Sequence, residues 1–312
     1  MSARAMGMAL IVLSLAACQE DGRHGGLAAE RQKPIRRTDH FQSLTVTGNT
    51  VVAVGSFGVV ASSTDGGNTW KRTELADGAA LVRVARCGDA GLVALDFTGK
   101  VWRAPADASA WTASPLPPTD AVLDATCTAD NRIWVTGARG LLLVSDDNGK
   151  SWASKSLDED IQLLNIQFPT ASFGVVAGEF GRVLTTHDGG ASWSQGGSLG
   201  EDFYPQAMHF ETDKRGLVVG LSGAVQETRD GGVSWTRAKT PIEAPLYGVL
   251  ALPGDEAVVV GAAGSAARLV GGVWSPVTGL PMTDLRGIAA TSGGVMLAGT
   301  GALLPLPLAK TN

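Results

Sequence analysis

The sequence contains few of the residues that build reactive or metal-binding sites. Among its 312 residues are three cysteines, two tyrosines and four histidines, the last being His24, His40, His187 and His209. No two histidines have the spacing of zinc ligands, and the acidic run at 158–160 lacks the alternation of a calcium-binding loop. No serine–histidine–aspartate or cysteine–histidine arrangement can be placed either. We therefore expect no metal ion, no cofactor and no enzymatic activity.

An excess of positive charge is also absent, as are long apolar runs beyond the N-terminus. The net charge is −5, with 44% hydrophobic and 18% charged residues. A negative chain is a poor match for nucleic acid or for an anionic membrane surface. No stretch after the N-terminus is long and apolar enough to cross a bilayer. The composition predicts a globular domain with a substantial core and no nucleic-acid partner.

The N-terminus has the pattern of an export signal. Arg4 precedes a short apolar run, and the segment ends in Leu15-Ala16-Ala17-Cys18. This ending resembles the bacterial lipobox, so we expect a signal peptide at 1–17 and lipidation of Cys18; the alternative is an ordinary signal with an incidental cysteine. Residues 18–29 are polar and glycine-rich, which favours a flexible tether. Gln19 after the cysteine is typical of sorting to the outer membrane. The expected location is its periplasmic face, with membrane contact only through the lipid.

Six tryptophans recur along the rest of the chain at a nearly constant spacing. They are Trp70, Trp111, Trp152, Trp193, Trp235 and Trp274, separated by 41, 41, 41, 42 and 39 residues. A period near 40 is typical of a repeat architecture, in which each unit buries its apolar surface against its neighbours.

Four of these tryptophans end a common phrase of the form Ser/Thr-x-Asp-x-Gly-x-Ser/Thr-Trp. Aspartate closes turns by accepting backbone N–H groups, and glycine supplies a positive φ. Each phrase follows a short apolar run, as a strand entering a tight turn does. We expect a structural role for Asp65, Trp70, Asp147, Trp152, Asp188, Trp193, Asp230 and Trp235.

A second ladder, of glycines, counts the repeats. Gly58, Gly99, Gly140, Gly181, Gly223, Gly264 and Gly301 each close a hairpin, usually as Gly-x-x-Gly. Together the ladders predict an all-β fold for 30–312, a seven-bladed β-propeller of four-stranded antiparallel blades. The last repeat stops one strand short, so we expect an N-terminal strand, Glu30–Arg36, to close the ring as the outer strand of the last blade.

Cys87 and Cys127 occupy matching places in adjacent repeats, 24 and 25 residues before Trp111 and Trp152. In an oxidising compartment such a pair can form a disulfide. Two buried free thiols are the alternative, and the sequence leaves both open.

The recurring phrase resembles the Asp-box, or BNR, repeat of sialidases and other propellers. With the Gly-x-x-Gly hairpins and the period of about 41, residues 30–312 resemble the photosystem II stability/assembly factor family. That resemblance implies a non-enzymatic assembly or scaffold role for a membrane complex. We expect the chain to be a monomer, with a membrane complex such as a transporter, or an exported protein or peptide, as its partner. In that family an arginine-rich patch has been proposed for docking, whereas here the arginines are scattered.

A carbohydrate-active, sialidase-like propeller is the alternative function. Only Tyr204 and Tyr247 could act as nucleophile, and the Arg-Ile-Pro signature of sialidases is absent. Loops on a rigid scaffold are favoured binding sites, with arginine and aromatic residues as anchors. On the face opposite the Asp-box turns, we expect a partner-binding rim made of Arg139, Glu179, Phe180, Arg182, Phe203, Tyr204, Tyr247 and Arg286.

Overall fold

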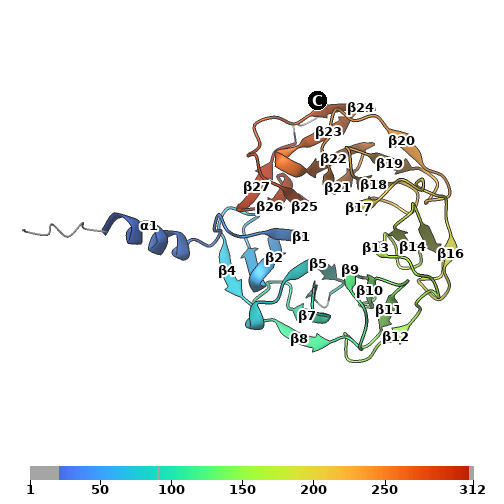
Figure 1. Ribbon diagram of the computed structural model, residues 1–312, viewed down its shortest axis with the longest axis horizontal. Helices are drawn as coiled ribbons and strands as arrows, with labels where there is room; N and C mark the ends of the chain where they lie inside the picture. The colour runs from blue at the N-terminus through green and yellow to red at the C-terminus, as the bar shows by residue number, and fades with distance from the viewer. Residues whose placement is uncertain (1–20, 90, 309–312) are drawn as a thin grey trace, which may run out of the picture. The chain divides into compact units, whose positions relative to one another are not determined.

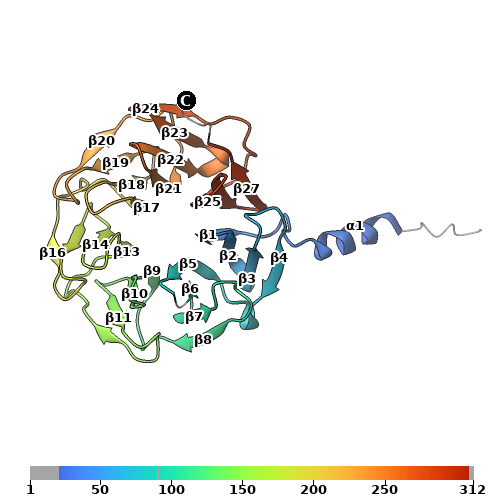
Figure 2. The same ribbon diagram turned by 180° about the vertical axis from the view of Figure 1, so that it is seen from behind.

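The computed structural model describes residues 21–89 and 91–308, and its main body is a seven-bladed β-propeller. Seven antiparallel sheets are arranged around a central axis, each with its first strand innermost (Figure 1, Figure 2). The predicted fold class is confirmed: six sheets have four strands, and the seventh has three among the described residues.

The blades follow one another in chain order. Blade 1 is β1 (Phe41–Thr47), β2 (Thr50–Gly55), β3 (Val59–Ser63) and β4 (Lys71–Glu74), and blade 2 is β5 (Leu81–Cys87), β6 (Gly91–Asp96), β7 (Lys100–Ala104) and β8 (Thr112–Pro115). Blade 3 is β9 (Val122–Cys127), β10 (Ile133–Gly137), β11 (Leu142–Ser145) and β12 (Ala153–Ser154), and blade 4 is β13 (Leu163–Gln167), β14 (Gly174–Gly178), β15 (Val183–Thr186) and β16 (Ser194–Gln195). Blade 5 is β17 (Pro205–Phe210), β18 (Gly216–Gly220), β19 (Val225–Thr228) and β20 (Thr236–Ala238), and blade 6 is β21 (Leu246–Leu252), β22 (Glu256–Gly261), β23 (Ala266–Val270) and β24 (Val273–Pro276). Blade 7 is β25 (Leu285–Thr291), β26 (Gly294–Gly299) and β27 (Ala302–Leu306), and short 3-10 turns lie at Ser56–Gly58, Ala76–Gly78 and Ala262–Gly264.

The core lies between neighbouring blades, because each sheet is covered on both faces. The second strand of a blade is accordingly a continuous apolar run: β14 and β18 are buried at every position. The outermost strands carry the exposed residues, as in β12 and β16. All four Asp-box tryptophans pack at the edges of these inter-blade cores.

The N-terminal segment closes the ring, as predicted, but by a different pairing. His40 forms an isolated antiparallel bridge with Thr300, and Gly301 N–H donates to Asp39 O at 2.7 Å. The Asp39 carboxylate also pairs with Arg72 Nη1 of blade 1 at 2.8 Å. Residues on either side of the closure are thus joined, and β1 packs beside β25.

The specific outer strand predicted at Glu30–Arg36 is wrong. Residues through Gln32 instead belong to helix α1 (Asp21–Gln32), and the described part of blade 7 has no fourth strand. The flexible tether expected at 18–29 is likewise helical from Asp21 onward. The second half of helix α1, Leu-Ala-Ala-Glu-Arg-Gln, consists mostly of strong helix formers. Their helix propensity outweighs the unfavourable effect of the glycines in the first half. The predicted signal peptide and Cys18 lie outside the described residues.

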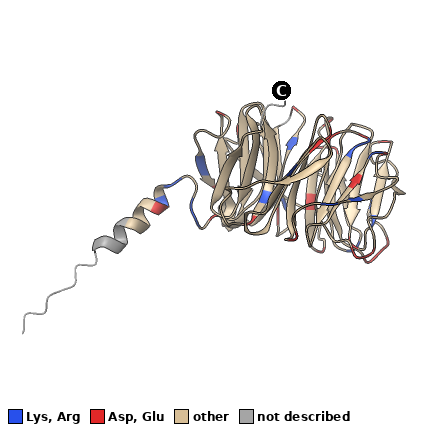
Figure 3. Ribbon diagram, turned by 90° about the horizontal axis from the view of Figure 1, so that it is seen from above, with Lys and Arg blue, Asp and Glu red and all other residues tan. Residues whose placement is uncertain are grey.

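The propeller presents its loops at two opposite ends, seen edge-on in Figure 3. One end, the Asp-box face, carries the turns between the third and fourth strands. The other, called the hairpin face here, carries the turns between second and third strands and the connections between blades. Backbone hydrogen bonds join the hairpins of this face to the neighbouring connections. For example, Leu75 N–H on a connection donates to Gly58 O on the hairpin of blade 1 at 2.8 Å.

Candidate partner-binding surface and central channel

The four complete Asp-box turns share one hydrogen-bond network. In the turn of blade 4, Asp188 Oδ1 accepts Ser192 N–H at 2.9 Å and the Thr186 hydroxyl at 2.7 Å, while Oδ2 accepts the Ser192 hydroxyl at 2.6 Å. Thr186 Oγ1 in turn accepts Gly190 N–H at 2.9 Å. The same bonds recur around Asp65, Asp147 and Asp230.

These hydrogen bonds stabilise the charged carboxylate, so they lower the aspartate pKa. The hydroxyl of Ser192 has the largest effect on Asp188, and that of Ser234 holds the pKa of Asp230 at about 2. The carboxylates have their acceptor positions occupied by their own turns. The conspicuous motif is therefore architectural, and these carboxylates are poor candidates for partner binding.

The hairpin face carries most of the candidate rim. Arg139 and Phe180 occupy the same hairpin position in blades 3 and 4, both with left-handed backbones at φ of 56°. Phe180 is 66% exposed. Arg139 Nε lies 3.6 Å from Asp120 Oδ2, in an exposed ion pair.

Arg182, Glu179 and Tyr204 are held by their surroundings on the same face. Arg182 Nη2 lies 2.7 Å from Glu159 Oε1. Glu179 Oε1 accepts the backbone N–H of Gln162 at 3.0 Å. Partial burial, and then the nearby charge of Glu179, raise the pKa of Tyr204. The three residues lie on the blade 4 hairpin and on the connection that follows blade 4.

The remaining candidates lie elsewhere. Phe203 is 8% exposed and packs in the core cluster of blades 4 and 5, so its side chain offers no surface to a partner. Its apolar ring is better satisfied between blades than at the rim. Arg286 and Tyr247 line the central channel, with the guanidinium carbon 4.2 Å from the ring centroid in a cation–π contact.

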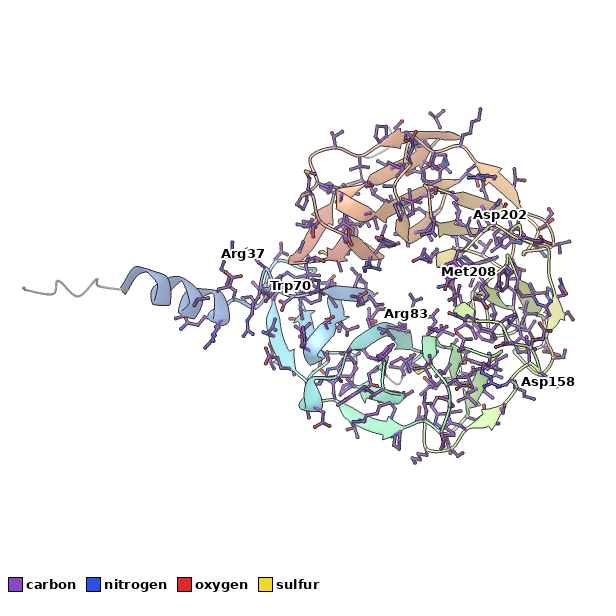
Figure 4. All side chains as sticks on the ribbon, viewed as in Figure 1. Arg37, Trp70, Arg83, Asp158, Asp202 and Met208 are labelled. Carbon is purple, nitrogen blue, oxygen red and sulfur yellow. A yellow bond between two sulfur atoms is a disulfide. The ribbon has the colours of Figure 1, made fainter. Side chains whose placement is uncertain are left out.

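The central channel has a volume of about 630 Å³ and is lined by the innermost strands. Arg83 projects into it (Figure 4), with Nε 3.0 Å from Asp124 Oδ1. Burial raises the pKa of Asp124, and Arg83 opposes that rise. Burial also lowers the pKa of His209 to about 4, helped by the charges of Arg83 and Arg215.

Several channel side chains join one innermost strand to the next. Asp124 Oδ2 accepts Ile166 N–H at 2.9 Å, joining blades 3 and 4. Gln167 bonds both backbone groups of Phe210, accepting at 2.7 Å and donating at 3.0 Å. His209 Nδ1 accepts Ala251 N–H at 3.2 Å, and Ser43 Oγ accepts Val84 N–H at 3.2 Å. These contacts, called inter-blade joints below, give the channel wall a structural function.

Cys87 and Cys127 form a disulfide between the innermost strands of blades 2 and 3, with Cα atoms 4.8 Å apart. Within residues 21–89 and 91–308, no group of three or more histidine, cysteine, aspartate or glutamate side chains could hold a metal ion. Over the same residues, no helix combines the length and apolarity needed to span a bilayer.

Four exposed apolar residues of the hairpin face were not among the predicted sites, and one of them is Met282, which is 90% exposed on the connection into blade 7. The other three, Phe57, Phe97 and Leu221, are 77%, 65% and 48% exposed on the hairpins of blades 1, 2 and 5. The glycine ladder could have revealed them, because Phe57 occupies the same hairpin position as Phe180. The joints made by Asp124 and His209 have no comparable signal, since the residue type differs from blade to blade.

Comparison with known proteins finds a matching sequence profile and a similar protein. The sequence profile described as photosynthesis system II assembly factor YCF48 matches residues 103–198. A photosystem II assembly lipoprotein, Ycf48 of Picosynechococcus, is 26% identical over 164 residues, covering 49% of this chain. The chain is a β-propeller that resembles Ycf48 over part of its length. The alignment spans 47% of that relative's length, so the relative's function extends to this chain only as a proposal.

Several solved structures share the propeller fold of this chain. YCF48 from Cyanidioschyzon merolae has a TM-score of 0.69 at 15% identity, over 85% of this chain and 95% of the other. A YCF48 bound to a D1 peptide also has a TM-score of 0.69 at 15% identity, covering 85% and 90%. A virginiamycin B lyase from Staphylococcus aureus reaches 0.73 at 13% identity, covering 85% and 93%. At such identities the likeness shows the fold alone.

Proposed function

We propose that this chain is a non-enzymatic assembly or scaffold factor that binds a protein segment of a membrane complex. The observation that carries the proposal is the sequence similarity to a photosystem II assembly lipoprotein, together with the match of residues 103–198 to the assembly-factor profile. A YCF48 of the same fold binds a D1 peptide. A transporter or another exported protein is as suitable a partner as a photosystem.

The binding surface in this proposal is the hairpin face. Arg139, Glu179, Phe180 and Arg182 stand on hairpins or the strand ends beside them, and Tyr204 on the connection that follows blade 4. A rigid ring holds these loops in place, so a partner can be bound with little ordering cost. Phe203 is excluded from this set by its burial, and Tyr247 with Arg286 belongs to the channel wall.

The chain is proposed to work from a lipid anchor on Cys18, as a monomer at the periplasmic face of the outer membrane. The Picosynechococcus relative is a lipoprotein, which supports the anchor. Cys18→Ala should release the protein from the membrane fraction into the soluble periplasmic fraction. Retention of that variant in washed membranes would contradict the anchor.

The partner is tested by crosslinking in intact cells, followed by isolation of the full-length chain from membranes and mass spectrometry. We expect subunits of one integral membrane complex, lost in the double variant Arg139→Glu/Arg182→Glu. The matched control is Lys150→Glu/Arg229→Glu, which reverses two exposed charges on the Asp-box face. Equal crosslinks from both double variants, or release of a fluorogenic sialoside by the purified chain, would overturn the proposal.

A further inference from the structure

The hairpin face exposes apolar side chains at costly backbone conformations. Phe57 and Phe180 are 77% and 66% exposed, at φ of 58° and 56°. Bulky residues seldom adopt the left-handed region, where asparagine or glycine is less strained. An exposed phenylalanine adds nothing to the core in compensation. Two such residues at equivalent hairpin tips, with Leu221 on the hairpin of blade 5, are typical of a surface that contacts another molecule.

Charge on the same face is unevenly balanced. Four basic side chains each pair with a carboxylate of this face: Lys100 with Asp77, Arg139 with Asp120, Arg182 with Glu159 and Arg286 with Asp284. Five further carboxylates are exposed, and within the described chain none of them takes part in an ion pair: Asp158, Asp160, Glu201, Asp202 and Glu243. The pairs are spread around the ring, whereas the unpaired carboxylates all lie on the three successive connections leading into blades 4, 5 and 6. There they outnumber the two exposed lysines of the same connections, Lys155 and Lys239.

These connections enclose the hairpin tip of blade 4. Glu179 N–H donates to Gln162 O on the first connection at 3.0 Å, and Gly181 O accepts from Leu199 on the second at 2.9 Å. Asp158 and Asp202 lie on the same side of the ring in Figure 4. Phe180 therefore stands between two acidic connections. We call the five unpaired carboxylates together with Phe180 and Leu221 the acidic sector.

We propose that the acidic sector binds a basic segment of a partner protein, in which lysine or arginine alternates with apolar side chains. The apolar side chains at the hairpin tips bind apolar side chains of the partner, and the unpaired carboxylates favour a positively charged partner over a negatively charged one. This inference rests on the proposed function and adds the chemistry of the partner. It also differs from a docking patch made of arginines, because here the arginines of the face already have carboxylate partners. Arg139→Glu/Arg182→Glu is therefore expected to act by placing like charges against Asp120 and Glu159 and displacing the loops, not by removing an attraction for the partner.

The probe is a synthetic peptide carrying lysines and leucines in alternate short blocks, with a twin in which every lysine is glutamate. Binding to the purified chain is measured by fluorescence anisotropy at several salt concentrations. We expect the lysine peptide to bind and to weaken with salt, and the glutamate twin not to bind. Neutralising the five carboxylates to asparagine or glutamine should weaken binding by about tenfold or more. Unchanged binding by that variant overturns the inference.

A matched pair of variants tests the anchor. Phe180→Asn and Phe57→Asn remove an exposed ring at the same hairpin position and the same φ, so both relieve similar strain. Only Phe180→Asn should weaken the lysine peptide, because Phe57 lies beside Asp77, whose charge Lys100 balances. Circular dichroism confirms that each variant is folded. Equal losses from the two variants overturn the inference.

The two proposals fail separately. In one outcome, crosslinks to a membrane complex are kept when the sector is neutralised but lost in Arg139→Glu/Arg182→Glu. That result would support the scaffold function and rule out the acidic sector as its binding site. Sector-dependent peptide binding without any crosslinked membrane protein would support the sector and contradict the scaffold function.

Discussion

The inter-blade joint at His209 predicts a pH dependence of stability. The imidazole lies in the channel wall and accepts Ala251 N–H through Nδ1, so the joint requires the neutral ring. Burial, with the charges of Arg83 and Arg215, lowers its pKa from 6.5 to about 4. Above pH 6.5 both the folded and the unfolded chain carry a neutral ring. Between pH 6.5 and 4 the unfolded chain binds a proton that the folded chain does not, so stability falls as the pH falls.

The magnitude follows from the two pKa values. Over this window the slope approaches about 1.4 kcal/mol per pH unit, so His209 alone should remove about 2 kcal/mol between pH 7.5 and pH 5. Below pH 4 the contribution of the His209 imidazole to the free energy of unfolding no longer changes with pH. The measurement is best made above pH 5, because the carboxylates of the Asp-box turns titrate at lower pH.

His209→Gln is the decisive variant. Gln167 occupies the corresponding position in blade 4 and bonds the N–H and C=O of Phe210, so glutamine at 209 should rebuild the joint without a titrating ring. Urea unfolding at pH 7.5 and pH 5 should show a loss in the wild type that exceeds the loss in His209→Gln by about 2 kcal/mol. His187→Gln, on an exposed Asp-box turn, retains His209 and should keep the wild-type difference. Equal losses in wild type and His209→Gln would refute the reasoning.

Three further predictions concern the scaffold. Reducing the disulfide between Cys87 and Cys127 should lower the free energy of unfolding by about 2–4 kcal/mol, measured by urea unfolding with and without dithiothreitol. Gly223→Ala should destabilise more than Gly271→Ala, by at least about 1 kcal/mol: both glycines have positive φ, but only at 223 would a Cβ collide with the backbone of the adjoining connection. Asp188→Ala should lower Tm and increase proteolysis within its turn, because four hydrogen bonds around Thr186 and Ser192 depend on that carboxylate directly or through its partners; an unchanged Tm would contradict this.

The repeat pattern was sufficient to predict the propeller, because each blade repeats the same turn chemistry. Asp65 and Asp188 sit 123 residues apart and make the same bonds, which is why their spacing counts blades. The closing segment was less predictable, since helix propensity before residue 33 competed with the need for an outer strand. The ends of the ring are instead joined by the bridge at His40, the carboxylate of Asp39 and the packing of β1 against β25.

The candidate surface was predicted only in part, because burial within a loop depends on packing that the repeat does not specify. Phe203 and Tyr204 are neighbours on one connection, yet Phe203 is in the core and Tyr204 is partly exposed. Asp96 falls at the hairpin face in sequence but is fully buried, where its carboxylate accepts the indole N–H of Trp102 at 2.8 Å. Loop residues of one type therefore divide between structural and exposed roles.

The inter-blade joints also explain why the hairpin face, and not the channel, is the better place for partner binding. Four of the joints use a channel side chain, and the remaining closures around blades 6 and 7 use close backbone approach instead: a Cβ on Gly248 would lie 2.7 Å from Arg286 O, and one on Gly287 would lie 3.0 Å from Leu44 N. A ligand that drew on the joint side chains would compete with the contacts that hold the ring together. The backbone of the hairpin tips holds the connections between blades, but the exposed ring of Phe180 makes no inter-blade joint. Replacing Phe180 should therefore leave the inter-blade joints intact, so its side chain is available for binding a partner.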